Sequence, residues 1–332
     1  MKKGMIKLAL TFSVIATASS AFAQPSGPIP AMNGGVVDAP VMQQHVPTKK
    51  VIPYAHLREA DYIWGKRVWR TIDLREKQNY PLYYPLVPLN DRWSLWDILK
   101  VNINEGNITS YSPFDPADET SELLDGDQFK YPLVTGAGYP DDVVKSLVEL
   151  SFNAVEYGEY YDKQKMDANG EPMYDEYDEP IYEEDEYGMA LQTRDTTKIP
   201  IEAQEIIEYK IKEDWFFDKQ RSVLDVRIEG IAPVVYRYQE KTIIGKRTLF
   251  WVYFPECRYV FQNYFVYNEH NDARRMSFDD LFWKRKFQSY IHKETNVYDR
   301  EINDHKVGVN ALLKSEDIKY QIFKFEHDVW HF

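Results

Sequence analysis

A run of acidic residues at 156–187 constrains the fold of this chain more than any other feature. It holds thirteen carboxylates against two lysines, and the hexapeptide EPMYDE (171–176) returns as EPIYEE (179–184) at a period of eight residues. An unpaired carboxylate is costly to bury, so a segment this acidic cannot join a hydrophobic core. We therefore expect 156–190 to be a solvated, tyrosine-rich linker, insertion or hinge between two folded parts.

The N-terminus has the pattern of a secretory signal peptide. Three lysines within residues 1–7 precede an apolar run at 8–18, and a small-x-small triplet follows at 21–23. The apolar run is shorter than the roughly 20 residues that span a bilayer as a helix. We expect cleavage between Ala23 and Gln24. No cysteine follows that site, so lipid attachment there is not expected, and no later stretch is apolar enough for membrane insertion.

Charge and cysteine content narrow the classes of partner and of fold. Cleavage at that site would take the net charge from -13 to -16, which argues against nucleic acid and anionic lipid surfaces as main partners. Cys257 is the single cysteine, so stability must come from a core and not from intramolecular disulfides. The 25 Tyr and 8 Trp exceed what a core usually needs, and such residues are enriched at protein interfaces.

The stretch IWGKRVWRTIDLREKQN (63–79) is interpreted as an amphipathic helix. Trp64, Val68 and Ile72 recur every four residues, and a basic face lies opposite this apolar stripe. The basic face would meet an acidic surface on a neighbour or, alternatively, solvent. The stripe would meet the core or a partner. The residues predicted to bind a partner are Trp64, Lys66, Arg67, Trp69, Arg70 and Arg75.

Serine caps predict two of the other helices. Ser94 in the helix at 92–100 and Ser277 in the helix at 275–282 are each followed, three residues on, by an aspartate that completes a capping box. A proline and two aspartates predict the start of another helix at 140–151.

Helix and strand patterns alternate in the part that follows the acidic run. A helix is expected from Pro200, because apolar residues repeat every four positions as far as Trp215. Strands are expected at 224–229 and 234–238. A turn at 245–246 then leads into the apolar run 248–254, interpreted as a central strand covered on both faces.

These elements predict an α+β fold, in which helices flank a small antiparallel sheet and an extended N-terminal arm and an acidic insertion complete the chain. The arm is rich in Pro and Gly, which favours a flexible linker or a strap that orders on a partner. The expected parts are a signal peptide (1–23), the arm (24–53), an N-terminal helical part (54–155), the acidic segment (156–190) and a C-terminal α+β part (191–332).

No motif in the sequence predicts a reaction centre. Cys257 beside aromatic residues favours packing over a nucleophile, and the His327/His331 pair has helical spacing but no carboxylate at a set distance. DANGEP (167–172) has its glycine too early for a calcium loop of the EF-hand type. We predict no catalytic, cofactor or metal residues. The alternatives are an exported carbohydrate-binding protein or hydrolase, and a calcium-dependent module built on 156–187.

Three segments resemble the GldN/PorN family of gliding-motility and type IX secretion proteins. They are ADYIWGKRVWRTIDLREKQNYPLYYP (60–85), RWSLWDIL (92–99) and MSFDDLFWKRKFQSYIHKETNVYDREI (276–302). The resemblance implies a non-enzymatic, periplasmic subunit that self-associates in a ring with the outer-membrane lipoprotein GldK/PorK. It also implies that the ring acts together with the inner-membrane motor formed by GldL and GldM/PorM. The family resemblance implies no catalytic residue and no cofactor for this chain. On this view, Arg67→Glu with Arg70→Glu should weaken the complex and leave the monomer folded.

Overall fold

The computed structural model describes residues 50–89, 92–115, 118–122, 128–134, 148, 151–162, 192–239, 242–268, 271 and 276–329. The chain divides into two compact units, Met1–Pro47 and Thr48–Phe332, and every described residue belongs to the second. Several predictions from sequence lie outside the described residues and stay predictions: the signal peptide with its Ala23–Gln24 cleavage site, most of the arm, most of the acidic segment, DANGEP (167–172) and His331.

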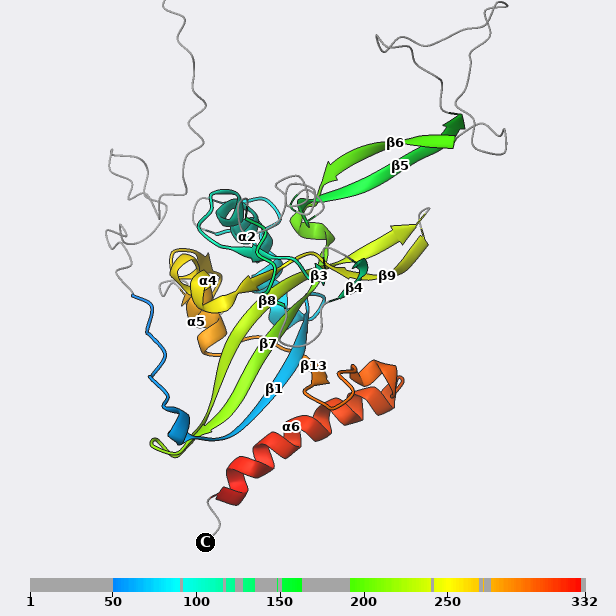
Figure 1. Cartoon of the computed structure of the whole chain (residues 1–332). Coiled ribbons are helices and arrows are strands. Elements are labelled where there is room, and N and C mark those ends of the chain that lie inside the picture. Colours follow the sequence, from blue (N-terminus) through cyan, green and yellow to red (C-terminus); the bar gives the residue numbers. More distant parts are fainter. Residues whose placement is uncertain are drawn as a thin grey trace, which may run out of the picture. The chain divides into compact units, whose positions relative to one another are not determined.

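A seven-stranded antiparallel sheet forms the centre of the second unit (Figure 1). The order is β13-β1-β7-β8-β10-β2, and β9 pairs with β8. Its strands are β1 (Tyr62–Asp73), β2 (Ser110–Tyr111), β7 (Ile206–Asp218), β8 (Val223–Gln239), β9 (Thr242–Thr248), β10 (Trp251–Tyr253) and β13 (Tyr290–Glu294). The mixture of helices and an antiparallel sheet confirms the α+β class, but the sheet is larger than the small one expected.

Short strand pairs and helices surround this sheet. The pairs are β3 (Phe114–Asp115) with β4 (Asp118–Glu122), β5 (Asn153–Asp162) with β6 (Gln192–Pro200), and β11 (Phe265–Val266) with β12 (Met276–Ser277). The α-helices are α1 (Tyr80–Tyr83), α2 (Leu95–Asn104), α4 (Phe254–Phe261), α5 (Phe278–Trp283) and α6 (Val309–Val329). The 3-10 helices are η1 (Glu59–Asp61), η2 (Lys77–Asn79), η3 (Ala203–Glu205) and η4 (Ile302–Asp304). Of the helix expected at 140–151, the described residues Val148 and Ser151 are helical.

The amphipathic helix expected at 63–79 is wrong, because the stretch up to Asp73 belongs to strand β1 and only Lys77–Asn79 forms a short 3-10 turn, η2. A spacing of four residues fits two strand repeats as well as one helical turn. The residues between decide the matter: Trp69 and Thr71 are buried beside Val68 and Ile72, so burial is not confined to one stripe. The segment is rich in β-branched and aromatic residues, which suit a pleated, buried surface. The structure pairs it with β7 along its length and with β13 at Val68–Thr71.

The helix expected from Pro200 to Trp215 is wrong for the same reason. Residues 203–205 form the 3-10 turn η3, and the rest belongs to β7. Ile207, Ile211 and Trp215 do recur every four residues, but Tyr209 between them is also buried, at 1% exposure. A run that is apolar at every second position marks a strand, and β7 occupies the middle of the sheet between β1 and β8.

Both serine caps are confirmed. The Ser94 hydroxyl accepts the Asp97 N–H at 3.1 Å and donates to the Asp97 carboxylate at 2.7 Å, which satisfies one of the free N–H groups at the start of α2. Ser277 accepts the Asp280 N–H at 3.1 Å at the start of α5. Because capping depends on residues three apart, it could be predicted without knowledge of the tertiary fold.

The strand pattern after Gly230 differs from the expectation. The two strands expected at 224–229 and 234–238 are parts of the single strand β8, which continues through Pro233. Gly245 and Lys246 lie within β9, where they pair with Arg237 and Tyr236 of β8, and they do not form a turn. The run 248–254 is buried over Thr248–Val252, as expected, but it is not one strand, because β9 ends at Thr248 and β10 begins at Trp251.

The acidic segment begins within β5 and ends just before β6, and these two strands are paired. Asn153 pairs with Pro200 at one end of the β5–β6 ladder, and Asp162 pairs with Gln192 at the other. The first acidic residues of the run, up to Asp162, therefore have extended backbone. The ladder pairs Asp162 with Gln192, the described residues on either side of 163–191, and the role of that stretch as a linker or insertion stays a prediction.

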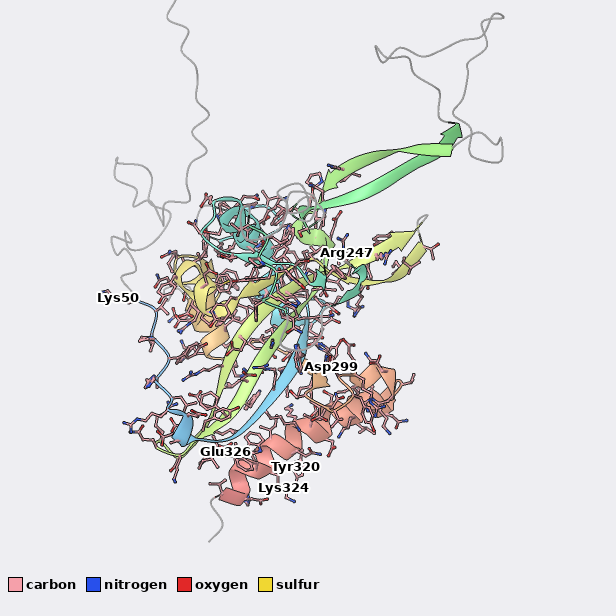
Figure 2. All side chains as sticks on the ribbon, in the orientation of Figure 1. Lys50, Arg247, Asp299, Tyr320, Lys324 and Glu326 are labelled. Atoms are coloured by element: carbon pink, nitrogen blue, oxygen red, sulfur yellow. The ribbon has the colours of Figure 1, made fainter. Side chains whose placement is uncertain are left out.

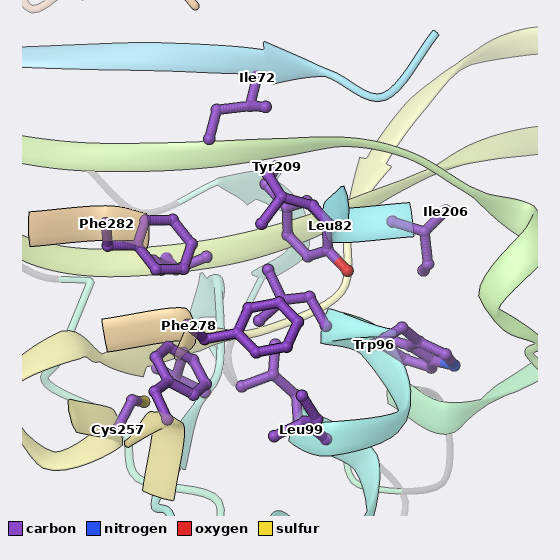
Figure 3. Close-up of a cluster of buried hydrophobic side chains, with 14 of the residues drawn as sticks. Ile72, Leu82, Trp96, Leu99, Ile206, Tyr209, Cys257, Phe278 and Phe282 are labelled. Atoms are coloured by element: carbon purple, nitrogen blue, oxygen red, sulfur yellow. The ribbon is translucent and has the colours of Figure 1, made fainter. Parts of the chain in front are cut away.

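The main core lies between one face of the sheet and the helices α2, α4 and α5 (Figure 3). Ile72 and Tyr209 extend from the sheet, and Leu99, Phe278 and Phe282 extend from the helices, all with 1% exposure or less. Burial of each such side chain contributes about 1.5–3 kcal/mol to stability. The apolar faces of α2 and α5 therefore dock where the sequence pattern predicted.

A second, smaller cluster joins α6 to the same sheet. Val68 of β1 and Ile291 of β13 contact Ile318 and Ile322 of α6, and Ile302 completes the cluster. The hydroxyl of Ser315 accepts the backbone N–H of Ile291 at 2.9 Å. The N-terminal half of β1 thus lies under α6, while its C-terminal half joins the main core.

Candidate interaction surface

The basic residues of β1 are paired with neighbouring strands of the same chain. Arg67 lies opposite Asp214 in the β1–β7 ladder and donates two hydrogen bonds to its carboxylate, at 2.6 and 2.7 Å. Lys66 forms an ion pair with Glu294 at 2.6 Å. Arg70 donates from Nε to the hydroxyl of Ser289 at 2.8 Å. Opposite charges directly across a ladder stabilise the sheet, so Arg67 and Asp214 contribute to the pairing of β1 with β7.

Arg70 and Arg75 differ most in exposure. Arg70 is 8% exposed, and burial lowers the pKa of its guanidinium. The Arg75 side chain is 70% exposed and pairs with Asp73 at 2.6 Å, which lowers the pKa of that carboxyl. Since Lys66 and Arg70 share a strand face with Val68, the expected separation into a basic and an apolar face is also wrong. Of the predicted basic residues, Arg75 is the most accessible to another protein.

The two tryptophans of β1 face opposite sides of the sheet. Trp64 stacks on Phe325 of α6 with ring centroids 4.3 Å apart. Trp69 is 2% exposed, and the ammonium groups of Lys293 and Lys212 lie 5.0 and 5.8 Å from the centroid of its ring system. Both residues therefore serve packing within the chain.

The two residues that directly follow the arm, Tyr54 and Ala55, are held by an aromatic and basic cluster. Tyr54 stacks on Trp283, and the guanidinium of Arg258 lies 4.6 Å from the Tyr54 ring centroid. Arg227 lies 5.1 Å from the same ring and donates to the Ala55 carbonyl at 2.5 Å. Burial raises the pKa of Tyr54 to about 12. The chain at Tyr54 and Ala55 is therefore attached to β8, α4 and α5 of the folded unit.

In the described part of the chain, large apolar side chains are exposed at several places, and three of these places hold groups of three or more. We call them the proline segment, the β8–β9 hairpin and the outer face of α6. Their exposed residues are Tyr80, Tyr84, Leu86, Val87 and Leu89 in the first, Tyr238, Ile243 and Ile244 in the second, and Val309, Leu312, Leu313, Tyr320 and Phe323 in the third. Single exposed apolar residues are ordinary, but groups of this kind mark surfaces that contact other proteins.

The cysteine and histidine considered as a nucleophile and a metal ligand do not lie together. Cys257 is fully buried in the main core, and burial raises the pKa of its thiol well above the usual value. His327 lies exposed on α6. Among the described residues, no group of three or more His, Cys, Asp or Glu side chains could hold a metal ion.

No helix in the part of the chain that the structure describes is long and apolar enough to cross a membrane. The longest one, α6, carries charged residues along its length, such as Lys314, Asp317 and Lys324.

A comparison with family models identifies the group of proteins to which this chain is related. The model described as "Gliding motility associated protein GldN" matches residues 57–331, from just before β1 to beyond the end of α6. The chain belongs to the GldN family. Membership associates it with gliding motility and type IX secretion. A search of curated proteins finds no match.

For this GldN-family chain, five of the six residues predicted to bind a partner lie on β1, Arg75 follows that strand, and the exposed apolar residues of α6 were not among them. The missed residues do carry a signal in the sequence, because Val309, Leu313, Tyr320 and Phe323 follow an alternation of four and three residues once Glu316 is included. A count of helical faces over 309–329 would have found two apolar faces in place of one.

Proposed function

We propose that the chain is a structural subunit of a periplasmic ring built with a GldK/PorK-like outer-membrane lipoprotein, in the type IX secretion and gliding machinery. The observation that carries this proposal is the family match over 57–331. The pattern of a secretory signal at 1–23 supports export, and the lipoprotein would associate the ring with the outer membrane. A GldM/PorM-like motor subunit would be a further partner.

The subunit would act by assembly and not by catalysis. The exposed apolar groups on the proline segment, the β8–β9 hairpin and α6 supply surfaces for neighbouring subunits. The buried, unreactive environment of Cys257 is what a packing residue requires. No cofactor forms part of the proposal.

Deletion of the gene in its host tests the function. We expect secretion of type IX cargo to stop, and surface movement to stop if the host glides. Both should return when the full chain is supplied in trans. Intact secretion in the deletion strain would contradict the proposal.

Co-expression with the lipoprotein tests assembly. We expect the pair to elute as a very large complex in which electron microscopy shows rings, while the chain alone elutes as a small species. N-terminal sequencing of the periplasmic chain should begin at Gln24. A chain that stays small with the lipoprotein present would contradict the ring.

Contact through the basic residues predicted to bind a partner, Lys66, Arg67, Arg70 and Arg75, needs a variant that leaves the fold intact. Arg70→Glu would place a carboxylate at a site that is 8% exposed, so the reversal of Arg67 and Arg70 would perturb the monomer itself. Arg75→Glu is the better test, because that side chain is 70% exposed. Arg221→Glu is the matched control, since Arg221 is also exposed and paired with an aspartate. We expect Arg75→Glu to lower co-purification of the lipoprotein and Arg221→Glu to leave it unchanged.

A further inference from the structure

Helix α6 docks on the sheet through one regular apolar face. Ile318 and Ile322 lie in the cluster with Val68, and Phe325 stacks on Trp64. Together with Ala311 and Ser315, these residues alternate in steps of four and three along the helix. That alternation is the spacing of a seam that packs against another element.

A second seam runs along the opposite side of α6. Its members follow the same alternation: Val309, Leu313, Glu316, Tyr320, Phe323 and His327. At about 100° per residue the two seams lie about half a turn apart. Val309 is 71% exposed, Leu313 and Tyr320 are 61% exposed, and Phe323 is 60% exposed, so the described part of the chain leaves this seam open. Figure 2 labels Tyr320 on this helix.

The area of this outer seam indicates that a protein covers it. A surface helix of a globular protein usually has one apolar stripe and a polar opposite face. Here Leu312 of α6 is 58% exposed, and Val307, two residues before the helix begins, is 83% exposed. Six such side chains, each able to bury on the order of 100 Å² of apolar surface, approach the roughly 800 Å² that each partner contributes to a standard interface. A patch of this size is unusual on a protein that stays monomeric.

We propose that the outer seam binds the same seam of a second copy of this chain, with the two α6 helices antiparallel. The dyad then lies at residue 318, and three layers form on either side of it. Val309 meets His327 of the partner subunit, Leu313 meets Phe323 of the partner subunit, and Glu316 meets Tyr320 of the partner subunit. The contact is isologous, so each layer occurs twice.

Glu316 decides the direction of the pair. In a parallel, in-register pair the two Glu316 carboxylates would face each other in a partly buried seam, which is unfavourable for like charges. In the antiparallel pair each carboxylate faces the tyrosine hydroxyl of the other copy, which can donate a hydrogen bond to it. Lys319 lies 3.5 Å from Glu316 in its own helix and offsets that charge in either arrangement. This contact involves the chain alone, so it does not depend on the proposed ring.

Solution mass measurements on the mature chain test whether the seam pairs. We expect a concentration-dependent dimer, and we expect Leu313→Asp with Phe323→Asp to give a monomer with an unchanged circular dichroism spectrum. The control is Ile243→Asp with Ile244→Asp on β9, whose side chains are 51% and 50% exposed. This control should keep the dimer. A monomeric wild-type chain, or equal loss of the dimer in both variants, would overturn the proposal.

Single cysteines test the antiparallel direction. The native Cys257 is fully buried and will not react in the folded chain. At about 1.5 Å rise per residue, the two copies of residue 319 lie about 3 Å apart along the helix axis and the two copies of residue 324 about 18 Å apart. With a short bis-maleimide we expect Lys319→Cys to give a covalent dimer and Lys324→Cys to stay monomeric. Equal cross-linking of both would show a parallel pair and contradict the proposal.

The lipoprotein is the competing occupant. If Leu313→Asp with Phe323→Asp abolishes co-purification of the lipoprotein while Lys319→Cys never cross-links, then the lipoprotein covers the seam and the proposal fails. If the ring forms normally with the Leu313→Asp, Phe323→Asp variant, the proposed ring function stands. The α6 pair would then not be needed for ring assembly.

Discussion

The buried ion pair between Arg285 and Glu213 gives a sharp test of how the two packing clusters are joined. Glu213 of β7 is fully buried, and Arg285 approaches its two carboxylate oxygens at 2.8 and 3.0 Å. Trp215 donates its indole N–H to the same carboxylate at 3.1 Å. Val68, the β1 residue opposite Glu213, lies in the small cluster, while Phe287, two residues after Arg285, lies in the main core. The pair therefore lies where the two clusters meet.

Arg285→Met should destabilise the chain by about 3–5 kcal/mol, because it leaves the carboxylate of Glu213 buried without its principal partner. Methionine keeps much of the aliphatic length of arginine. Residue 285 has φ 52°, a backbone conformation that favours glycine. Arginine and methionine are strained alike in this conformation, so the strain cancels when the variant is compared with the natural chain. Arg70 contributes a second positive charge near Glu213, which places the expected loss toward the lower end of the range.

The matched control is Arg221→Met. The Arg221 side chain is 41% exposed and pairs with Asp218 and Asp225 near the turn between β7 and β8. The Asp218 side chain is 5% exposed, but it also accepts the backbone N–H groups of Gln220 and Arg221, so Arg221→Met leaves its carboxylate hydrogen-bonded and should cost much less than Arg285→Met. Glu213→Leu combined with Arg285→Met removes both buried charges, so the double variant should recover most of the stability that Arg285→Met loses.

Urea unfolding followed by tryptophan fluorescence and far-UV circular dichroism measures these differences. The guanidinium of Arg285 lies 5.3 Å from the centroid of the Trp215 ring system, so fluorescence also reports the local change. If Arg285→Met and Arg221→Met lower the free energy of unfolding by the same amount, the pair has no special structural role and the reasoning fails.

Three further predictions concern caps and titration. Ser94→Ala and Ser277→Ala should each cost about 1 kcal/mol in thermal or urea unfolding, because each removes an acceptor for a helix N–H. Burial, together with the positive charge of Lys210, lowers the pKa of His292 well below its usual value. The contribution of neutral His292 to folding stability is therefore complete above about pH 6.5 and is lost as the pH falls below that value. His292→Gln should flatten that fall in an unfolding series from pH 7.5 to 5. Burial raises the pKa of Tyr54 to about 12. The contribution of the neutral Tyr54 hydroxyl to folding stability is therefore complete below about pH 10 and is lost as the pH rises toward 12. Tyr54→Phe should reduce the alkaline loss, as measured by unfolding from pH 9 to 11.

Local signals were sufficient to predict part of this fold. The starts of α2 and α5 could be predicted because a serine and the N–H three residues on are adjacent in any helix. The apolar faces of those helices, including Phe278 and Phe282, also form the core where expected. The period of four failed on β1 and β7, because it cannot separate one helical turn from two strand repeats. Strands buried on both faces lack the polar stripe that would have distinguished them.

Contacts between distant residues explain why the ion pairs made by the basic residues of β1 could not be predicted. Arg67 and Asp214 are 147 residues apart in sequence and lie directly opposite each other in the sheet. A basic stretch in an acidic chain was interpreted as a surface for an acidic neighbour. Its principal acidic neighbours, Asp214 and Glu294, belong to the same molecule. Charge patterns along one segment therefore predict partners poorly where the segment is a central strand, since strands on either side supply the opposite charges.

The same argument identifies the surfaces that remain for other proteins. A side chain whose charge is satisfied within the sheet, such as Arg67, gains little from a second partner, because exchange of one ion pair for another is close to neutral. An exposed apolar side chain such as Phe323 gains the full free energy of its burial when a partner covers it. Assembly by this chain should therefore depend more on α6, the proline segment and the β8–β9 hairpin than on the basic residues of β1.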